Sequence, residues 1–267
     1  MKITLKKGDI GDASTEYVRI AIKKESKGTK RLVKEDGIET LEIGMPAGMN
    51  ARKFMLLCRS VVNAAKANTS RKIAIQFDPA PELFKIPENI SPEYISQLAA
   101  ENFEMANFEF NIFKTEPKEG WNSIEEILLY GTFSPAIEKA IEKGQEIGRA
   151  VNACRTLANT PGGDITPTSL ARAAKEAVKG LPVKVTLLGT KEMKKLGMGA
   201  LLGVAKGSTE PPTFTILEYR GGKGAPIVLA GKGVTFDSGG LNLKPSSGIY
   251  EMHMDMSGAA AVIHAVA

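Results

Sequence analysis

The apolar and polar positions in the first half of the chain alternate between strand-like and helix-like patterns. Short alternating or apolar runs predict strands at residues 3–5, 17–22, 72–77 and 108–113. Apolar residues at helical spacing predict helices over residues 51–67 and 92–105. Because strands and helices are interleaved, this pattern predicts an N-terminal α/β domain with a mixed sheet.

A long helix is predicted from Ser134-Pro135 to the region of Asn159. Ser134 is a suitable cap, Pro135 suits the first turn, and apolar or small residues recur at helical spacing beyond them. We expect this helix to link two domains, because 267 residues exceed the ~100–200 residues of one domain. The predicted division is an N-terminal domain over 1–133, a linking helix over 134–160 and a second α/β domain over 161–267.

The second half of the chain repeats the mixture of strands and helices. A capped helix is predicted from Thr166-Pro167 to Gly180. Apolar runs predict strands of a second sheet at residues 183–188, 213–219 and 227–230. Residues 258–267 are almost all apolar and lack a polar face, so we expect the terminal helix to be buried on all sides.

Charge and cysteine content narrow the class of protein only modestly. The chain carries 35 basic and 30 acidic side chains, and a net charge of +5 does not by itself indicate a nucleic-acid partner. Basic residues do cluster around Gly28, between Lys23 and Lys34; we interpret them as a solvated hairpin loop, with a phosphate-binding patch as the alternative. Cys58 and Cys154 lie in helical apolar patterns without a second cysteine at metal or redox spacing, which predicts buried thiols in a reducing compartment.

The sequence also bears on localisation. Its N-terminus alternates like a strand and lacks the apolar core of a signal peptide. No segment reaches the roughly 18 uninterrupted apolar residues that a membrane span needs. We therefore expect a soluble, cytoplasmic protein without a membrane partner.

Two lysines and two aspartates lie near one glycine-rich stretch. Lys232 follows the predicted strand 227–230, Asp237 lies on the loop beyond it, and Lys244 and Asp255 come next. Carboxylates are hard oxygen ligands, so the two aspartates suit a divalent ion such as zinc, manganese or magnesium. Lys232 is either a counter-ion or, deprotonated beside a cation, a nitrogen ligand. An ordinary ion pair between Lys232 and Asp237 stays open as the simpler interpretation.

A nucleotide-binding loop is the other chemistry that glycine beside lysine brings to mind. A Walker-type loop needs a glycine five positions before Gly231 and a serine or threonine after the lysine. Pro226 and Gly233 occupy those positions, so the pattern fails twice.

Two segments resemble the leucyl (cytosol) aminopeptidases, a two-metal family that forms hexamers. The first is residues 231–240, Gly-Lys-Gly-Val-Thr-Phe-Asp-Ser-Gly-Gly, continued by Leu-Lys-Pro-Ser at 243–246 and Met-Asp-Met-Ser-Gly-Ala-Ala-Ala at 254–261. The second is residues 157–167, which is similar to the family's entry into its catalytic domain. The resemblance covers about residues 149–267 and implies the first part of an α/β/α-sandwich catalytic domain.

The resemblance also implies a role for each charged residue. Lys232 would be a nitrogen ligand to the more loosely held metal, Asp237 a carboxylate that bridges both metals, and Asp255 a second carboxylate on the loose site. Lys244 would stay protonated and polarise the substrate carbonyl or the developing oxyanion. Two zinc or manganese ions roughly 3.5–4 Å apart would activate a water and hold the α-amine of a peptide. The implied reaction releases N-terminal residues, preferably bulky apolar ones, from peptides.

The chain departs from the family pattern in one respect. The family's second motif, Asn-Thr-Asp-Ala-Glu-Gly-Arg, supplies further metal ligands and an arginine that anchors a bicarbonate proton shuttle, and the chain stops before such a motif. We therefore expect the front part of a larger enzyme, which would be a homo-hexamer at full length. With three candidate ligands, largely on one metal site, the 267 residues alone are predicted to be catalytically silent and to bind metal weakly or not at all.

Two alternatives belong to other classes of function. Some bacterial members of the family bind DNA, and the basic residues from Lys23 to Lys34 offer a surface for it. A regulatory, shortened homologue without peptidase activity is the other alternative.

Overall fold

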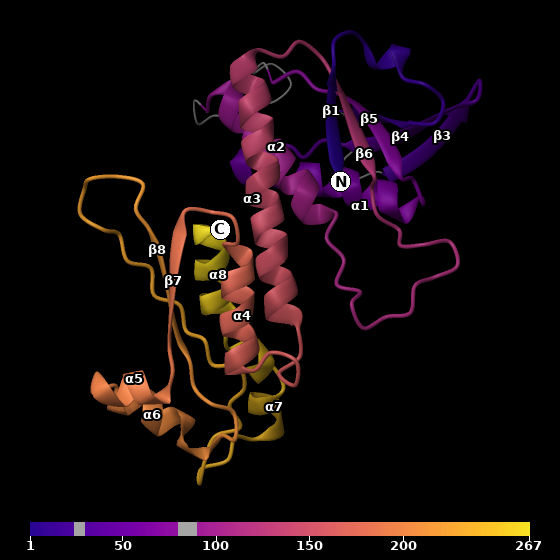
Figure 1. The fold of residues 1–267 in the computed structure, drawn as a ribbon. Helices are drawn as coiled ribbons and strands as arrows, with labels where there is room; N and C mark the ends of the chain where they lie inside the picture. The colour runs from indigo at the N-terminus through magenta and orange to yellow at the C-terminus, as the bar shows by residue number, and fades with distance from the viewer. Residues whose placement is uncertain (24–29, 80–89) are drawn as a thin grey trace. The chain divides into compact units, whose positions relative to one another are not determined.

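The chain divides into two compact units, Met1–Asn152 and Ala153–Ala267, which are described separately. The structure is a computed structural model that describes residues 1–23, 30–79 and 90–267 (Figure 1). The division between the units falls inside the long helix α3, Pro135–Asn159. The domain boundaries that we placed at residues 134 and 161 stay predictions.

The first unit is built on a six-stranded mixed sheet. Its strands are β1 (Lys2–Lys6), β2 (Val18–Lys23), β3 (Lys30–Glu35), β4 (Ile38–Gly44), β5 (Lys72–Gln76) and β6 (Glu126–Tyr130), in the spatial order β1-β6-β5-β2-β4-β3. Neighbouring strands are parallel except β3 and β4, which form an antiparallel hairpin. Asp36 and Gly37 form its turn with positive φ angles of 49° and 79°, as a two-residue hairpin loop favours. The predicted α/β fold class is confirmed.

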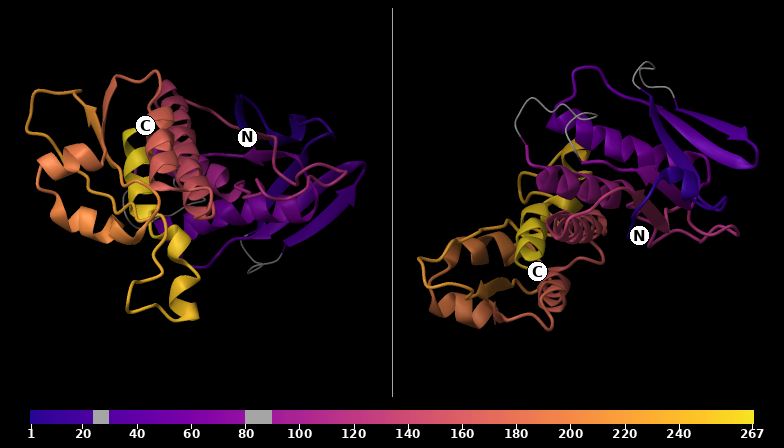
Figure 2. Two further views of the ribbon diagram at one scale, coloured as in Figure 1. Left: turned by 60° about the horizontal axis from the view of Figure 1, so that its bottom comes forward. Right: turned by 90° about the horizontal axis from the view of Figure 1, so that it is seen from above.

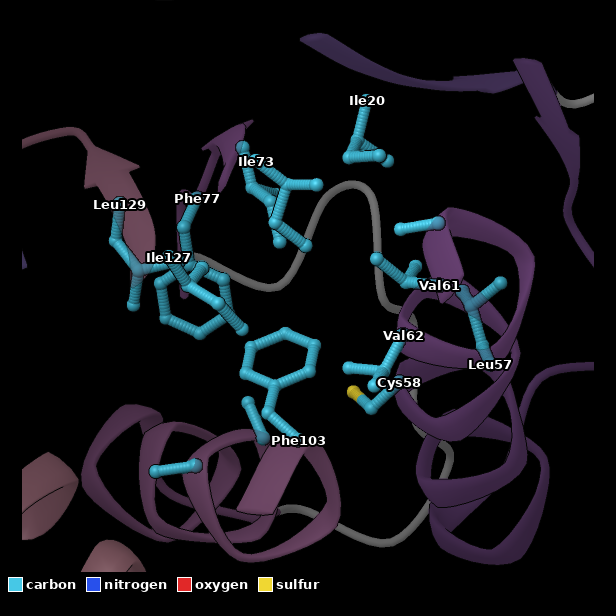
Figure 3. Close-up of a cluster of buried hydrophobic side chains, with 14 of the residues drawn as sticks. Ile20, Leu57, Cys58, Val61, Val62, Ile73, Phe77, Phe103, Ile127 and Leu129 are labelled. Carbon is cyan, nitrogen blue, oxygen red and sulfur yellow. The ribbon is translucent and has the colours of Figure 1, made fainter. Parts of the chain in front are cut away.

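Helices α1 (Ala51–Ala67) and α2 (Pro92–Ala106) pack against this sheet. Asn50 caps α1 by accepting a hydrogen bond from the Lys53 amide, and Ser91 caps α2 in the same way. Figure 3 shows Phe103 of α2 and Val62 of α1 turned toward the apolar side chains of the sheet. These residues belong to one large apolar core, to which the first turns of α3 also contribute.

The predicted strand at residues 108–113 is wrong. The chain forms an irregular loop there, in which the rings of Phe110 and Phe113 pack on each other with centroids 6.0 Å apart. Asn107 closes the loop through two hydrogen bonds to the main chain of Ile124, at 2.7 and 2.8 Å. The strand position between β1 and β5 is taken by β6 instead, since its consecutive apolar residues can be buried on both faces of the sheet.

The predicted hairpin loop between Lys23 and Lys34 is also wrong in its pairing. Strands β2 and β3 are not neighbours, because β4 lies between them. Residues 24–29, which carry part of this basic cluster, lie outside the described residues.

The second unit is built around a two-stranded antiparallel sheet, β7 (Val183–Leu188) and β8 (Phe214–Tyr219). Helices α4 (Pro167–Ala177) and α8 (Ser257–Val266) lie side by side and contact β8 (Figures 1 and 2). The remaining elements are short helices: α5 (Thr190–Lys195), α6 (Gly199–Val204), η2 (Ala205–Gly207), α7 (Ser246–Ile249) and η3 (Met252–Met254). A small core includes Leu157, Leu170, Met256 and Ile263.

Two sequence predictions for this unit are wrong. Residues 227–230 form no strand; Ile227, Val228 and Leu229 are 91%, 83% and 55% exposed. A strand needs a hydrogen-bonded neighbour, and in the described part of the chain the second sheet contains β7 and β8 alone. Helix α8 is not buried on all sides, because Ala260 and Ile263 are buried while other positions are exposed. Within the described ranges, no helix is long and apolar enough to cross a membrane.

Candidate metal centre

The candidate site begins with an extended segment that lies against the start of α8. The Ala259 amide donates a hydrogen bond to the Lys232 carbonyl at 2.9 Å. A Cβ added to Gly231 would lie 2.7 Å from the Ala259 Cα and closer still to the Gly258 carbonyl oxygen. A Cβ on Gly258 would lie 3.0 Å from the main-chain nitrogen of Lys232. Glycine on both sides is therefore what allows the two backbones to approach, and this contact brings Lys232 close to Asp255.

A tight turn brings the second lysine, Lys244, back to the first aspartate, Asp237. Gly239 has a φ of +97° and pairs with Leu243 in an isolated β-bridge, and the Lys244 amide donates to the Ser238 carbonyl at 3.0 Å. A Cβ at Gly239 would lie 2.5 Å from the Asn242 carbonyl oxygen, so both the backbone angle and the space favour glycine. The turn returns the Lys244 side chain to Asp237.

The four predicted site residues form two ion pairs. Lys232 Nζ lies 2.6 Å from Asp255 Oδ2, and Lys244 Nζ lies 2.6 Å from Asp237 Oδ2. The simpler interpretation, an ion pair between Lys232 and Asp237, is wrong, because Lys232 pairs with Asp255 and Asp237 pairs with Lys244. The two pairs are near enough that the charge of Lys232 also acts on Asp237.

Asp237 is held as an anion. Its Oδ2 accepts a hydrogen bond from Lys244, and its Oδ1 accepts one from the Gly239 amide at 2.8 Å. These bonds, together with the charges of Lys244 and Lys232, hold the pKa of Asp237 below its usual range, against the opposing effect of burial. Asp237 therefore needs no proton loss at neutral pH before it can serve as a ligand.

Two contacts near the site were not predicted. Lys244 Nζ lies 3.2 Å from the Met252 sulfur, a weak acceptor that lies eight residues along the chain. Gly162 lies against the site segment, since a Cβ there would be 3.0 Å from the Phe236 ring and 3.3 Å from the Thr235 carbonyl. The second contact shows that the two motif segments pack together, which spacing in the sequence could not indicate.

The donor atoms fit one divalent cation in part. The carboxylates of Asp237 and Asp255 and the nitrogen of Lys232 are of the types that zinc and manganese accept. The nitrogen and one carboxylate oxygen already lie close together. In residues 1–23, 30–79 and 90–267 there is no group of three or more His, Cys, Asp or Glu side chains that could hold a metal ion. The cluster thus offers an incomplete set for one ion, and the ligand roles stay predictions.

Residues 152–267 match the family described as "Cytosol aminopeptidase family, catalytic domain". A probable cytosol aminopeptidase of Alkaliphilus oremlandii is 33% identical over 243 residues, which cover 85% of this chain and 49% of the relative. The chain therefore spans about half the length of this curated relative. The relative's name refers to peptidase activity and not to nucleic acid, so the DNA-binding alternative is not favoured.

Two solved structures share the fold. A tomato leucine aminopeptidase mutant has a TM-score of 0.80 and 22% identity, with 100% of this chain and 58% of that chain covered. The bottromycin maturation enzyme BotP in complex with Mn has a TM-score of 0.76 and 24% identity, with 95% and 55% covered. At these identities the likeness concerns the fold alone.

Proposed function

This chain is a member of the cytosol aminopeptidase family, and from that premise we propose that its lysine and aspartate cluster is part of the metal site of a metal-dependent aminopeptidase. The observation that carries the proposal is the convergence of Lys232, Asp237, Lys244 and Asp255 in two neighbouring ion pairs of 2.6 Å. Ion pairs at a surface are common, but these four residues come from the segment that matches the family.

We assign the metal to three of these residues. Asp237 and Asp255 would hold a zinc or manganese ion through their carboxylates, and Lys232 through its neutral amine. The ion, when bound, would supply Lewis-acid activation of water and of the substrate carbonyl. The hydrogen bonds from Lys244 and from the Gly239 amide support this role, because they hold the ionised Asp237 carboxylate in position.

Lys244 has a different role in the proposal. Its ammonium is an electrostatic donor that would polarise the substrate carbonyl and stabilise the developing oxyanion. The side chain is 30% exposed, so it can reach a substrate while its stem is held by the protein. Contacts with Asp237 and Met252 place the ammonium beside the proposed metal ligands.

The substrate class follows from the family. We propose peptides with a free N-terminus, and among them those that begin with a bulky apolar residue. Support for an apolar pocket comes from Met252, which is partly exposed beside Lys244, whereas Met256 is buried in the core and is not available. A cytosolic location, a homo-hexamer and a bicarbonate proton shuttle are parts of the same proposal, taken from the family resemblance and the relative's name.

The 267 residues by themselves are proposed to be inactive. The three donors belong largely to one ion and leave a second ion without a ligand set of its own among the described residues. A two-metal centre needs both ions to hold the attacking and the leaving groups.

Hydrolysis of leucine p-nitroanilide tests the proposal. The product of the whole reading frame that encodes these residues should hydrolyse it after loading with Mn²⁺, and activity should vanish with EDTA or in Asp237→Asn. Asp9→Asn, which changes an exposed carboxylate of the first unit, is the matched control and should keep full activity. The 267-residue polypeptide should remain near the buffer rate. Activity that survives both EDTA and Asp237→Asn would contradict the metal site.

A further inference from the structure

The two lysines of the cluster are held in different ways. Lys232 reaches Asp255 from a side chain that is 62% exposed. The side chain of Lys244 is 30% exposed, and its Nζ lies within 3.2 Å of three acceptors: the carboxylate of Asp237, the carbonyl of Asp237 and the sulfur of Met252. Lys244 is therefore the more firmly placed of the two ammonium groups.

Lys244 donates a hydrogen bond to Asp237 Oδ2, an oxygen that would be a ligand of the proposed metal ion. Asp237 Oδ1 already accepts the Gly239 amide at 2.8 Å, and Oδ2 accepts the Lys244 ammonium at 2.6 Å. A divalent cation on Oδ2 would take the place of that ammonium or lie directly beside it. Like charges at such a separation repel each other. The ammonium therefore weakens the binding of the ion to this oxygen, and the ion weakens the hydrogen bond from the ammonium.

Lys232 stands in the opposite relation to the ion. Its nitrogen is one of the three donors of the proposed ligand set, so the residue that pairs with Asp255 would itself hold the ion. Lys244 has no such place in the proposed ligand set. It would act on the ion through its positive charge and through its hydrogen bond to Asp237.

We propose that Lys244 is an internal competitor for the metal ion at Asp237. Its ammonium neutralises the carboxylate, and it would have to leave Oδ2 for a divalent cation to bind there. The inference rests on the proposed metal site and concerns its regulation: the same lysine that serves catalysis limits how tightly the chain holds metal. The two lysines therefore have opposite effects on metal affinity.

Binding of Mn²⁺ to the product of the whole reading frame that encodes these residues, followed by the electron paramagnetic resonance signal of the free ion, tests this directly. Lys244→Met keeps most of the length of the side chain and removes the charge. It should lower the Kd by about two- to fivefold, as expected for a partly exposed pair. Lys232→Met removes a ligand and should raise the Kd by about tenfold or more. Lys206→Met, at an exposed lysine of η2 in the same unit, should leave the Kd unchanged.

The outcomes separate the inference from the proposed function. If Asp237→Asn and Lys232→Met weaken Mn²⁺ binding but Lys244→Met leaves it unchanged or weaker, the competition is refuted and the metal site stands. If Asp237→Asn and Lys232→Met bind as the unaltered chain does, or if no variant binds Mn²⁺ at all, the site itself is refuted. Lys244→Gln also removes the charge and should lower the Kd for Mn²⁺ in the same way. Circular dichroism of both Lys244 variants checks that they are folded.

Discussion

The two units of the chain differ in the interactions that stabilise each of them. In Met1–Asn152, a six-stranded sheet and its helices share one large apolar core. In Ala153–Ala267, a two-stranded sheet has a small core, while Ile227, Val228 and Leu229 are exposed. The candidate site lies in the second unit, where close glycine contacts and ion pairs position the side chains. Apolar burial thus stabilises the first unit, whereas backbone fit and charge define the site in the second.

The largest effect is expected from a cavity in the first core. Phe103→Ala removes a ring that is buried among the sheet residues, and should lower the free energy of unfolding of the first unit by about 3–5 kcal/mol (Figure 3). Leu170→Ala in the smaller second core should cost about 2 kcal/mol, at the low end for such changes, because that core closes around fewer side chains. Amide hydrogen exchange resolves the two units separately. An equal loss in both would remove the difference between the cores.

A methyl group at the glycine contact should damage the site. Gly231→Ala drives a Cβ into the backbone of Gly258 and Ala259, and overpacking of this kind costs about 1–3 kcal/mol. Exchange protection of the α8 amides should fall, and Mn²⁺ binding with it. Gly233→Ala is the matched control, since its Cβ would meet its nearest neighbours at 3.4 and 3.5 Å. Equal behaviour of the two variants would show that close backbone approach does not position the site.

A polar cluster in the first unit should give a smaller, pH-dependent effect. Thr4 and Tyr17 donate hydrogen bonds to the Glu126 carboxylate at 2.6 and 2.8 Å and lower its pKa. Burial and the bond to Glu126 raise the pKa of Tyr17 to about 12, so its hydroxyl remains a donor at neutral pH. Because the folded-state pKa of Glu126 is lowered, its contribution to stability is present above the unfolded value of about 4.3 and is lost as pH falls through the folded value.

Glu126→Gln should therefore cost about 1 kcal/mol at pH 7, and the difference from the unaltered chain should shrink below about pH 4.3. Urea unfolding of the first unit at both pH values measures this. Tyr17→Phe removes one of the hydrogen bonds and should show part of the same pH dependence. A difference that grows on acidification would have the wrong sign for a carboxylate with a lowered pKa.

The smallest expected effect is a difference in the rate at which the two thiols are modified. Cys58 is buried in the first core and Cys154 is partly buried beside the second, and burial raises the pKa of both. Iodoacetamide at pH 8 should therefore modify Cys154 first, and Cys58 only after unfolding, as mass spectrometry would show. Similar rates at both positions would mean that the first core opens as readily as the second.

Local features of the sequence predicted much of the fold. Ser134 and Thr166 cap α3 and α4 as expected, since a capping side chain bonds to an amide three residues away. The run at 227–230 failed because hydropathy reveals an apolar segment but not whether a neighbouring strand exists to pair with it. Strand β6 was missed because its four consecutive buried residues, Ile127 to Tyr130, show no alternation of apolar and polar positions.

The candidate site was predicted in its members but not in its pairing. The glycine-rich stretch pointed to Lys232, Asp237, Lys244 and Asp255, and the structure brings them together in two ion pairs. That Lys232 pairs with Asp255 depends on the contact between residues 231 and 258–259, which no local spacing encodes. The role of these residues as metal ligands stays a prediction.

Paramagnetic broadening of amide resonances by Mn²⁺ would test most directly whether Lys232, Asp237 and Asp255 share one cation. At substoichiometric Mn²⁺, the amide signals of these three residues should broaden first and together, while those of Asp9 and Asp12 in the first unit stay sharp. Broadening that begins at Asp9 and Asp12, or that spares residues 232, 237 and 255, would contradict the account.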